Sequence, residues 1–435
     1  MLAIVVVAFV IQGLGWAWVG AGIRRVREDA SALEADPPLT VSGETPPPAP
    51  DPTVGASRQL ARADLEAVSL GHPDPAPSTL EDGLPITVVV AAHNEADRLP
   101  ALLDALDAQT HRPFEVVVVD DRSTDRTGAL VHHRAPDFPA PLRLVRVEDA
   151  DLEAAGLPPK KHALERGLEA ATHDRIAFTD ADGRPDPKWL ATLARWASLE
   201  DGTRPRGQRT ASRTTHGLED AGAMLIGYGP YLREPDLLNR FVRYETVTTA
   251  ALAAAAVGWG RPWHAVGRNL SVPTSLLREI GGYAHSAGSL SGDDDLLVQE
   301  VAALEVAPVR YVWSPAAVPS PAPPDWAAFW RQKRRHASAG SHYPTTVLAA
   351  LGLFNASSLT LWIGAPVLHL ATGVPFGWGL LAAKLLLQRS VLADVLDGLG
   401  DEPDLRLWQP VLDGLSAVYH AAFSLLGLLP TPTRW

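Results

Sequence analysis

Cysteine is absent from the 435 residues of this chain, which excludes disulfide bonds and thiolate metal sites. Lysine is scarce, and arginine supplies nearly all the other positive charge; the lysines are Lys160, Lys161, Lys188, Lys333 and Lys384. The formal net charge is −12, which argues against broad binding of a polyanion. We therefore expect no nucleic-acid partner, and any metal site here must do without thiolates.

Apolar residues are concentrated in separate stretches, although the mean hydropathy is only +0.01. Residues 2–21 carry no charge and are about long enough to cross a bilayer, and Arg24, Arg25 and Arg27 follow at once. A cleaved signal peptide would carry its positive charge before the apolar run. Residues 1–27 are therefore expected to anchor the chain in a membrane, with the next domain in the cytoplasm. A buried core helix is the alternative.

Two regions on either side of the central part also have a distinctive composition. Residues 28–84 are rich in Pro, Ala, Asp and Glu, and this predicts a disordered or extended linker. Residues 345–435 contain three long apolar stretches, at 347–371, 376–396 and 408–429. We expect a C-terminal membrane region of two to three helices, and hence a multi-pass protein of the inner cell membrane. The middle stretch carries Lys384 and Arg389, so it could instead lie at the membrane interface.

The central part alternates between strand and helix patterns. Buried strands are expected at 86–92, 114–119, 142–147 and 175–179, and helices at 96–108, 160–171 and 187–197. This alternation predicts an α/β domain over residues 85–325, with a mainly parallel sheet and helices on both faces. Residues 200–220 are polar and are expected to form a surface loop. A long helix at 237–256, a short strand at 267–272 and helices at 274–280 and 295–304 complete the domain.

Pairs of acidic residues end two of the predicted strands. Asp120 and Asp121 follow one run of valines, and Asp180 and Asp182 follow another strand. Ligands of open parallel sheets bind beyond the carboxyl ends of the strands. Carboxylates gathered there are costly unless something positive binds them, and Mg²⁺ or Mn²⁺ carrying a diphosphate prefers such oxygen ligands. The spacing predicts that one of Asp180 and Asp182 bridges metal and ribose while the other ligates the metal.

Three further motifs fit the binding of a nucleotide. The turn His93-Asn94-Glu95 after the first strand could hold a base or ribose, although helix capping is an equal alternative. One of Asp120 and Asp121 could accept from a base while the other braces the loop, or both could belong to an Asx turn. Lys160 or Lys161 lies at a predicted helix start, where a diphosphate is favoured; a solvated charge is the alternative.

Two motifs lie nearer the C-terminus. Asp293, Asp294 and Asp295 open a predicted helix, and crowding raises the pKa of at least one of them, which suits a general base; ordinary helix charge is the alternative. Residues 326–344 are expected to form an amphipathic interface helix. Gln332 and Arg335 would face a diphosphate while the aromatic residues Trp326, Phe329 and Trp330 lie in lipid; juxtamembrane charge alone would also explain the arginines.

In this order and spacing the motifs resemble an inverting family 2 glycosyltransferase of the GT-A fold, over about residues 85–343. The segments HNE and VVDD match that family's nucleotide-binding turns, KKHAL matches its lysine helix start, and DAD matches its metal motif. GDDD matches its acidic base motif, which favours Asp294 as the base and Asp293 next. GRNLSV resembles its acceptor-side strand. QKRRH matches its Gln-x-x-Arg-Trp motif except that His336 replaces the tryptophan.

The resemblance implies transfer of one sugar from a nucleoside-diphosphate sugar, such as a UDP-sugar, with Mg²⁺ or Mn²⁺ as cofactor. The acceptor would be a hydroxyl of a lipid or membrane-associated molecule, such as a carotenoid or ceramide, among membrane lipids. His336 and the short membrane region disfavour a polysaccharide synthase. Transfer to polyprenyl phosphate, an inactive membrane scaffold and a sugar-phosphate nucleotidyltransferase are the remaining alternatives. A nucleotidyltransferase would need a Gly-rich, Arg-containing loop after the first strand, which this sequence lacks. An inactive scaffold would be expected to have lost some of the carboxylates, which are all present here.

Overall fold

A computed structural model describes residues 1–35, 83–203, 222–400 and 402–426. The predicted linker at 28–84 and the predicted loop at 200–220 lie mostly outside these ranges. Within them, residues 28–35 continue the first helix, and residues 200–203 continue α6 (Trp189–Thr203) instead of starting a loop.

A seven-stranded sheet forms the centre of the described chain, in the order β3-β2-β1-β4-β6-β5-β7. The strands are β1 (Ile86–Ala92), β2 (Phe114–Asp121), β3 (Leu142–Val147), β4 (Arg175–Phe178), β5 (Met224–Ile226), β6 (Leu270–Pro273) and β7 (Val309–Tyr311). β1 pairs in parallel with both β2 and β4, β3 is parallel to β2, and β7 is parallel to β5. Only β6 runs against its neighbours. The predicted α/β class with a mainly parallel sheet is confirmed.

Helices cover both faces of this sheet because its strands are apolar on both sides. In β1, Val88 and Val90 face one core cluster and Val89 faces the other, and all are fully buried. On the first face α2 (Leu99–Asp107) buries four leucines at helical spacing: Leu99, Leu102, Leu103 and Leu106. Each such burial contributes about 1.5–3 kcal/mol relative to exposure. α5 (Pro159–Ala170) and α7 (Leu237–Gly258) pack on the other face.

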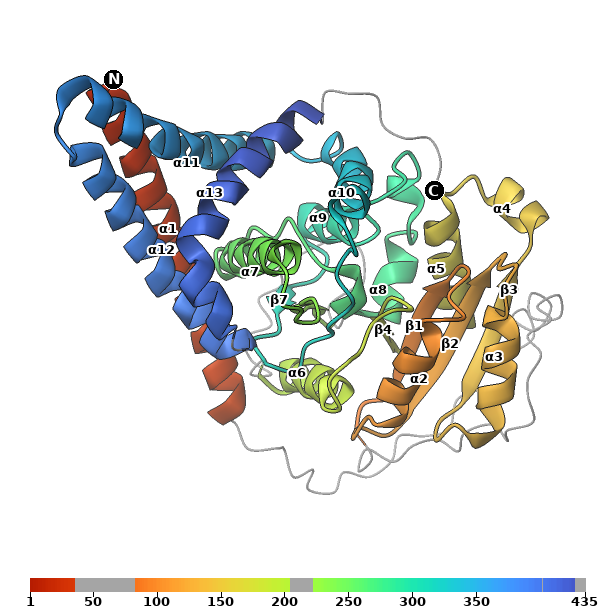
Figure 1. The fold of residues 1–435 in the computed structure, drawn as a ribbon. Helices are drawn as coiled ribbons and strands as arrows, with labels where there is room; N and C mark the ends of the chain where they lie inside the picture. The colour runs from red at the N-terminus through yellow and green to blue at the C-terminus, as the bar shows by residue number, and fades with distance from the viewer. Residues whose placement is uncertain (36–82, 204–221, 401, 427–435) are drawn as a thin grey trace.

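Shorter helices connect the strands, and long ones gather on one side of the molecule. The shorter ones are α3 (Thr127–Arg134), α4 (Asp149–Ala155), α8 (Thr274–Glu279), α9 (Asp295–Leu304) and α10 (Trp326–Gly340). The long ones are α1 (Leu2–Ala35), α11 (Thr345–Thr372), α12 (Phe376–Leu399) and α13 (Pro403–Leu426). Figure 1 shows these four together, with α7 between them and the sheet. We call α1, α7, α11, α12 and α13 the helix bundle.

Two described helices are long and apolar enough to cross a membrane, at Leu2–Ala32 and Thr345–Thr372. Length and composition alone are weak evidence, because core helices of soluble proteins pass the same test. α12 and α13 do not belong to this set, so the expected multi-pass arrangement is not supported. Lys384 in α12 is buried inside the bundle, paired with Asp413 of α13.

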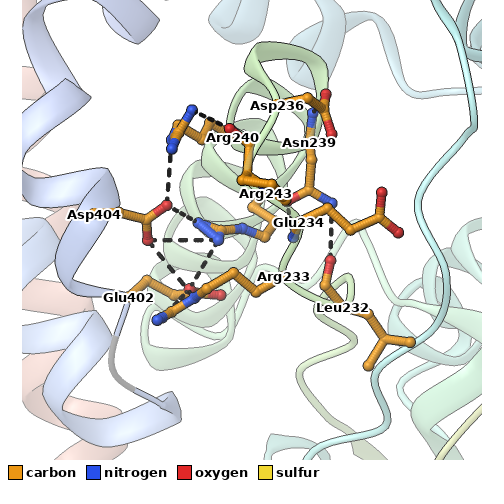
Figure 2. A network of polar contacts seen from close by, with 10 residues as sticks. Leu232, Arg233, Glu234, Asp236, Asn239, Arg240, Arg243, Glu402 and Asp404 are labelled. Carbon is orange, nitrogen blue, oxygen red and sulfur yellow. Dashed lines mark hydrogen bonds and ion pairs between the residues drawn. The ribbon is translucent and has the colours of Figure 1, made fainter.

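A buried network of ion pairs connects α7 to the start of α13 (Figure 2). The side chain of Arg243 is fully buried and pairs with Asp404 at 2.6 Å and with Glu402 at 3.4 Å. Arg233 also pairs with Glu402, at 2.8 Å, and Arg240 lies 3.6 Å from Asp404. Removing one partner of such a pair leaves an uncompensated buried charge, which is strongly destabilising. The network therefore holds the start of α13 against α7 within the helix bundle.

Candidate active site

The second acidic strand end lies in a tight turn after β4. The carbonyl oxygen of Asp180 accepts a hydrogen bond from the backbone N–H of Gly183, at 2.9 Å. A side chain at position 183 would meet the hydroxyl of Thr179 at 2.7 Å, so the turn requires glycine. This turn brings Asp180 and Asp182 to the wall of one cavity of about 1070 Å³. Burial and the neighbouring Asp180 raise the pKa of Asp182 above its usual value.

The loops after β1 and β2 hold each other in place. Asn94 has a left-handed φ of 56°, and its side-chain oxygen accepts from the backbone N–H of Thr124 at 2.8 Å. Asp120 accepts from the backbone N–H of Ser123 at 3.0 Å. The described residues that line the cavity do not include Asn94 or Asp120. The contact of Asn94 braces the two loops, whereas that of Asp120 lies within its own turn, and the base-binding role of this pair stays a prediction.

The other predicted nucleotide-binding residues of these loops do line the cavity. They are His93, Glu95 and Asp121. His93 contacts the other loop directly, since its Nδ1 lies 2.6 Å from the carbonyl oxygen of Asp121. Asp121 is also paired with Arg122 at 2.8 Å. The parallel pairing of β1 with β2 explains this meeting, because Ala92 stands opposite Asp120 and the two strands end at one edge.

Lys160 joins the two acidic motifs that the sequence places far apart. Its Nζ lies 3.1 Å from Asp180 Oδ1 and 2.8 Å from Asp293 Oδ2. Burial would lower the pKa of Lys160, but these carboxylates outweigh burial and raise it well above its usual value. Lys161 differs, since its buried Nζ donates to the carbonyl oxygens of Ser286 and Ser289. The structure thus distinguishes the two lysines that the sequence left as alternatives.

The three acidic residues before α9 differ in their surroundings. Asp294 caps the helix, accepting from the backbone N–H groups of Asp295 and Gly267, each at 2.8 Å. Burial and the neighbouring carboxylates Asp295 and Asp293 raise the pKa of Asp294 to about 7. Burial would raise the pKa of Asp293 too, but Lys160 outweighs burial and lowers it. At neutral pH, Asp294 is the one poised to accept a proton.

Two site residues were missed by the sequence analysis. Asp295 pairs with His264 Nδ1 at 2.7 Å and accepts from the hydroxyl of Tyr343. Both partners line the cavity. Burial would raise the pKa of Asp295, but His264 and Tyr343 lower it. A triple aspartate signals that cations or donors are needed nearby, but nothing local in the sequence identifies His264 or Tyr343 as the source.

Helix α10 contributes its predicted residues, with one correction. Gln332, Arg335 and His336 line the cavity, and Gln332 Nε2 donates to the hydroxyl of Tyr231 at 3.3 Å. Phe329, expected in lipid, is instead fully buried. It contacts the ring of Phe241 in α7, because the apolar side of α10 packs on protein.

The residues present fit a divalent cation held by two carboxylates and a diphosphate. Within the described ranges no three His, Asp or Glu side chains come together as a complete metal cage. Asp180 and Asp182 offer carboxylate oxygens from one turn at the wall of the cavity. Mg²⁺ is commonly bound in this way, through one or two carboxylates together with substrate phosphates. A cation would also offset the burial and the repulsion from Asp180 that together raise the pKa of Asp182.

Comparison with known proteins gives a family for part of the chain. Residues 87–203 match the sequence model of the family described as glycosyl transferase family 2. The probable glycosyltransferase YdaM of Bacillus subtilis (strain 168) is 24% identical over 271 residues, which cover 61% of this chain and 57% of that protein. The 4,4'-diaponeurosporenoate glycosyltransferase of Staphylococcus aureus (strain MRSA252) is 37% identical over 97 residues, covering 22% of this chain and 24% of that one.

A solved structure also aligns along most of the chain. It is the mannosyltransferase PcManGT from Pyrobaculum calidifontis in complex with GDP-Man and Mn²⁺. The alignment covers 96% of this chain and 99% of that one, with 19% sequence identity and a TM-score of 0.47. The chain spans just over half the length of YdaM and about a quarter of the staphylococcal protein. The family match covers β1 to α6, the part of the chain that holds the acidic strand ends.

Proposed function

Starting from a chain with a family 2 glycosyltransferase domain, we propose an inverting, metal-dependent enzyme. It moves one sugar from a nucleoside-diphosphate sugar, such as a UDP-sugar, to a hydroxyl of a lipid or membrane-associated acceptor. One observation carries the proposal: Lys160 joins the acidic turn after β4 to the acidic motif before α9, within a single cavity. Donor-binding and proton-accepting groups are then neighbours, as direct transfer between two bound substrates requires.

The donor would lie at the strand ends. His93, Glu95 and Asp121 bind the nucleoside, while Lys160 and Arg335 stabilise the charge that develops on the leaving diphosphate. Asp182, with Asp180, would hold Mg²⁺ or Mn²⁺. When bound, the ion neutralises phosphate oxygens as a Lewis acid. A diphosphate would compete with Asp180 and Asp293 for the ammonium of Lys160.

The acceptor hydroxyl would lose its proton to Asp294. A base with a pKa of about 7 is ionised in a large fraction of molecules near neutral pH and still attracts a proton well. The hydroxyl oxygen bonds to the anomeric carbon as the bond to the diphosphate breaks on the opposite side of that carbon. One base and one direct displacement give inversion, without the two flanking carboxylates of a glycosidase.

The full-length protein in membranes, offered UDP- and GDP-sugars with a total lipid extract, tests this proposal. Mass spectrometry should find lipids that gain a single sugar only when the protein and a divalent cation are present. Asp294→Asn should keep donor binding and stop transfer. If Asp293→Asn does this while Asp294→Asn stays active, the base is Asp293; near-normal transfer by both variants would contradict an aspartate base in this motif.

A further inference from the structure

The cavity extends beyond the site described above, into the helix bundle. Its lining there includes Gln12 and Trp16 of α1, Phe354 of α11, Lys384 and Gln388 of α12 and Asp413 of α13. We call this part the bundle branch. A volume of about 1070 Å³ lies at the upper end of pockets for single small ligands. Trp16 and Phe354 add apolar surface to the polar residues of this branch, which suits a molecule with an apolar part better than the sugar diphosphate of the donor.

The bundle branch contains polar atoms without protein partners. Gln12 is fully buried, and its Nε2 donates to Phe354 O at 2.6 Å and to Ser357 Oγ at 2.8 Å. This fixes the amide orientation and leaves Oε1 as an acceptor without a partner in the described part of the chain. The Oε1 of Gln388 and the indole N–H of Trp16 are buried and, within the same ranges, equally unpartnered.

The bundle branch presents no spare positive charge. Both carboxylate oxygens of Asp413 lie 2.5 Å from Lys384 Nζ, and the ammonium of Lys384 is buried. Trp362 Nε1 also donates to Asp413, at 2.7 Å. An anionic ligand would meet the carboxylate of Asp413, which is already paired with Lys384. Unfilled amide acceptors instead favour a ligand that donates hydrogen bonds, such as an alcohol.

We propose that the bundle branch binds the acceptor, an uncharged, elongated amphipathic alcohol with a second hydroxyl remote from the one that receives the sugar. That second hydroxyl donates to the Oε1 of Gln388 or Gln12. The inference rests on the proposed function, because it takes the ligand of this branch to be the acceptor. It narrows the acceptor to a neutral alcohol and disfavours polyprenyl phosphate.

The test uses the full-length protein in phosphatidylcholine nanodiscs. Three probes, 1,12-dodecanediol, 1-dodecanol and dodecyl phosphate, are titrated separately, and binding is followed by the rise in thermal unfolding temperature. The diol should bind about three- to tenfold more tightly than the mono-alcohol, the effect of one added hydrogen bond. Gln388→Leu should abolish that preference and leave the affinity for 1-dodecanol unchanged. Gln12→Leu, on a different helix, provides a second test if the first variant does not fold.

Gln409→Leu is the matched control. Gln409 is a buried glutamine of α13 that donates to Leu385 O at 3.1 Å and is not a lining residue of the cavity. It should keep the preference for the diol. The inference is overturned if wild type binds the diol and the mono-alcohol equally, if the control loses the preference as Gln388→Leu does, or if dodecyl phosphate binds most tightly.

The proposed function is followed separately on the same nanodiscs. Titration of UDP and GDP measures the donor site, and sugar transfer measures turnover. Selective diol binding without transfer to any acceptor would contradict the proposed enzyme activity but not the proposed alcohol site. Transfer to lipid, with equal binding of the three probes, would contradict the alcohol site alone.

Discussion

The pH dependence of transfer tests the role of Asp294 most directly. With a pKa of about 7, Asp294 is ionised in about one tenth of molecules at pH 6 and about nine tenths at pH 8. The value of kcat/KM, which reports the free enzyme, should therefore rise about tenfold between these two pH values and then level off. Initial rates measured from pH 5.5 to 9 check this expectation. A profile that is flat between pH 6 and pH 8 would refute the assignment of the base.

Substitution of the neighbouring Asp293 should shift this pH profile in a predictable direction. Asp293→Asn removes one of the charges that raise the pKa of Asp294, so the rise in rate should move to lower pH. In Asp294→Asn any residual rate should lack the rise altogether. A profile identical to that of the wild type in both variants would show that another group titrates.

Stability should depend on pH through the same residue. The pKa of Asp294 is raised from 3.8 to about 7 in the fold, so its stabilising effect is complete below about pH 4 and is lost as the pH rises through 7. A rise in pKa from 3.8 to about 7 corresponds to a cost of about 4 kcal/mol for ionising Asp294. This figure is an upper limit, because Asp293 and Asp295 titrate together with Asp294 and share the shift. Asp294→Asn should therefore unfold at a higher temperature than wild type at pH 8, and at a similar temperature near pH 4.

Three further predictions concern metal, packing and topology. Asp182→Asn should abolish turnover that depends on Mg²⁺ or Mn²⁺. The control Asp186→Asn should turn over normally, because Asp186 is on the same loop but does not line the cavity. Near-normal rates in Asp182→Asn would contradict the metal role. Arg243→Met should lower the free energy of unfolding by about 1–3 kcal/mol, because Asp404 and Glu402 lose their fully buried partner but keep Arg233 and Arg240. The more exposed Arg240→Gln should cost less, and denaturant titrations of both variants measure the difference. Protease added to right-side-out vesicles should leave residues 85–343 intact if the catalytic domain is cytoplasmic, and cleavage there would reverse the expected orientation.

Strong local patterns allowed the sequence to predict the centre of the fold. The valines of β1 and β2 can only be buried on both faces, so their place in the sheet follows from composition alone. β5 and β7 were missed because each has three residues, too few for a period to be recognised. α4 was also missed, since its run of acidic residues and alanine has no apolar stripe.

The site was predicted in its residues but not in its pairings. Asp180, Asp293 and Lys160 were each identified from local motifs, while the contact that joins all three depends on the meeting of β4, α5 and the loop before α9. His264 was not identified, because a single histidine gives no sign of its partner Asp295. In the bundle, Lys384 suggested an interfacial position until its burial against Asp413 was seen. Long-range pairing of charges is the information that a single sequence does not display.

The position of Lys160 between the two acidic motifs has one more consequence. A single ammonium serves as counter-ion to both the metal-binding turn and the proton-accepting segment. Any anion that draws Lys160 toward itself must weaken its hold on Asp293 and so make the neighbouring aspartates more basic. Arrival of the donor would thereby raise the pKa of these aspartates, and a substitution of Lys160 would alter leaving-group departure and proton removal together.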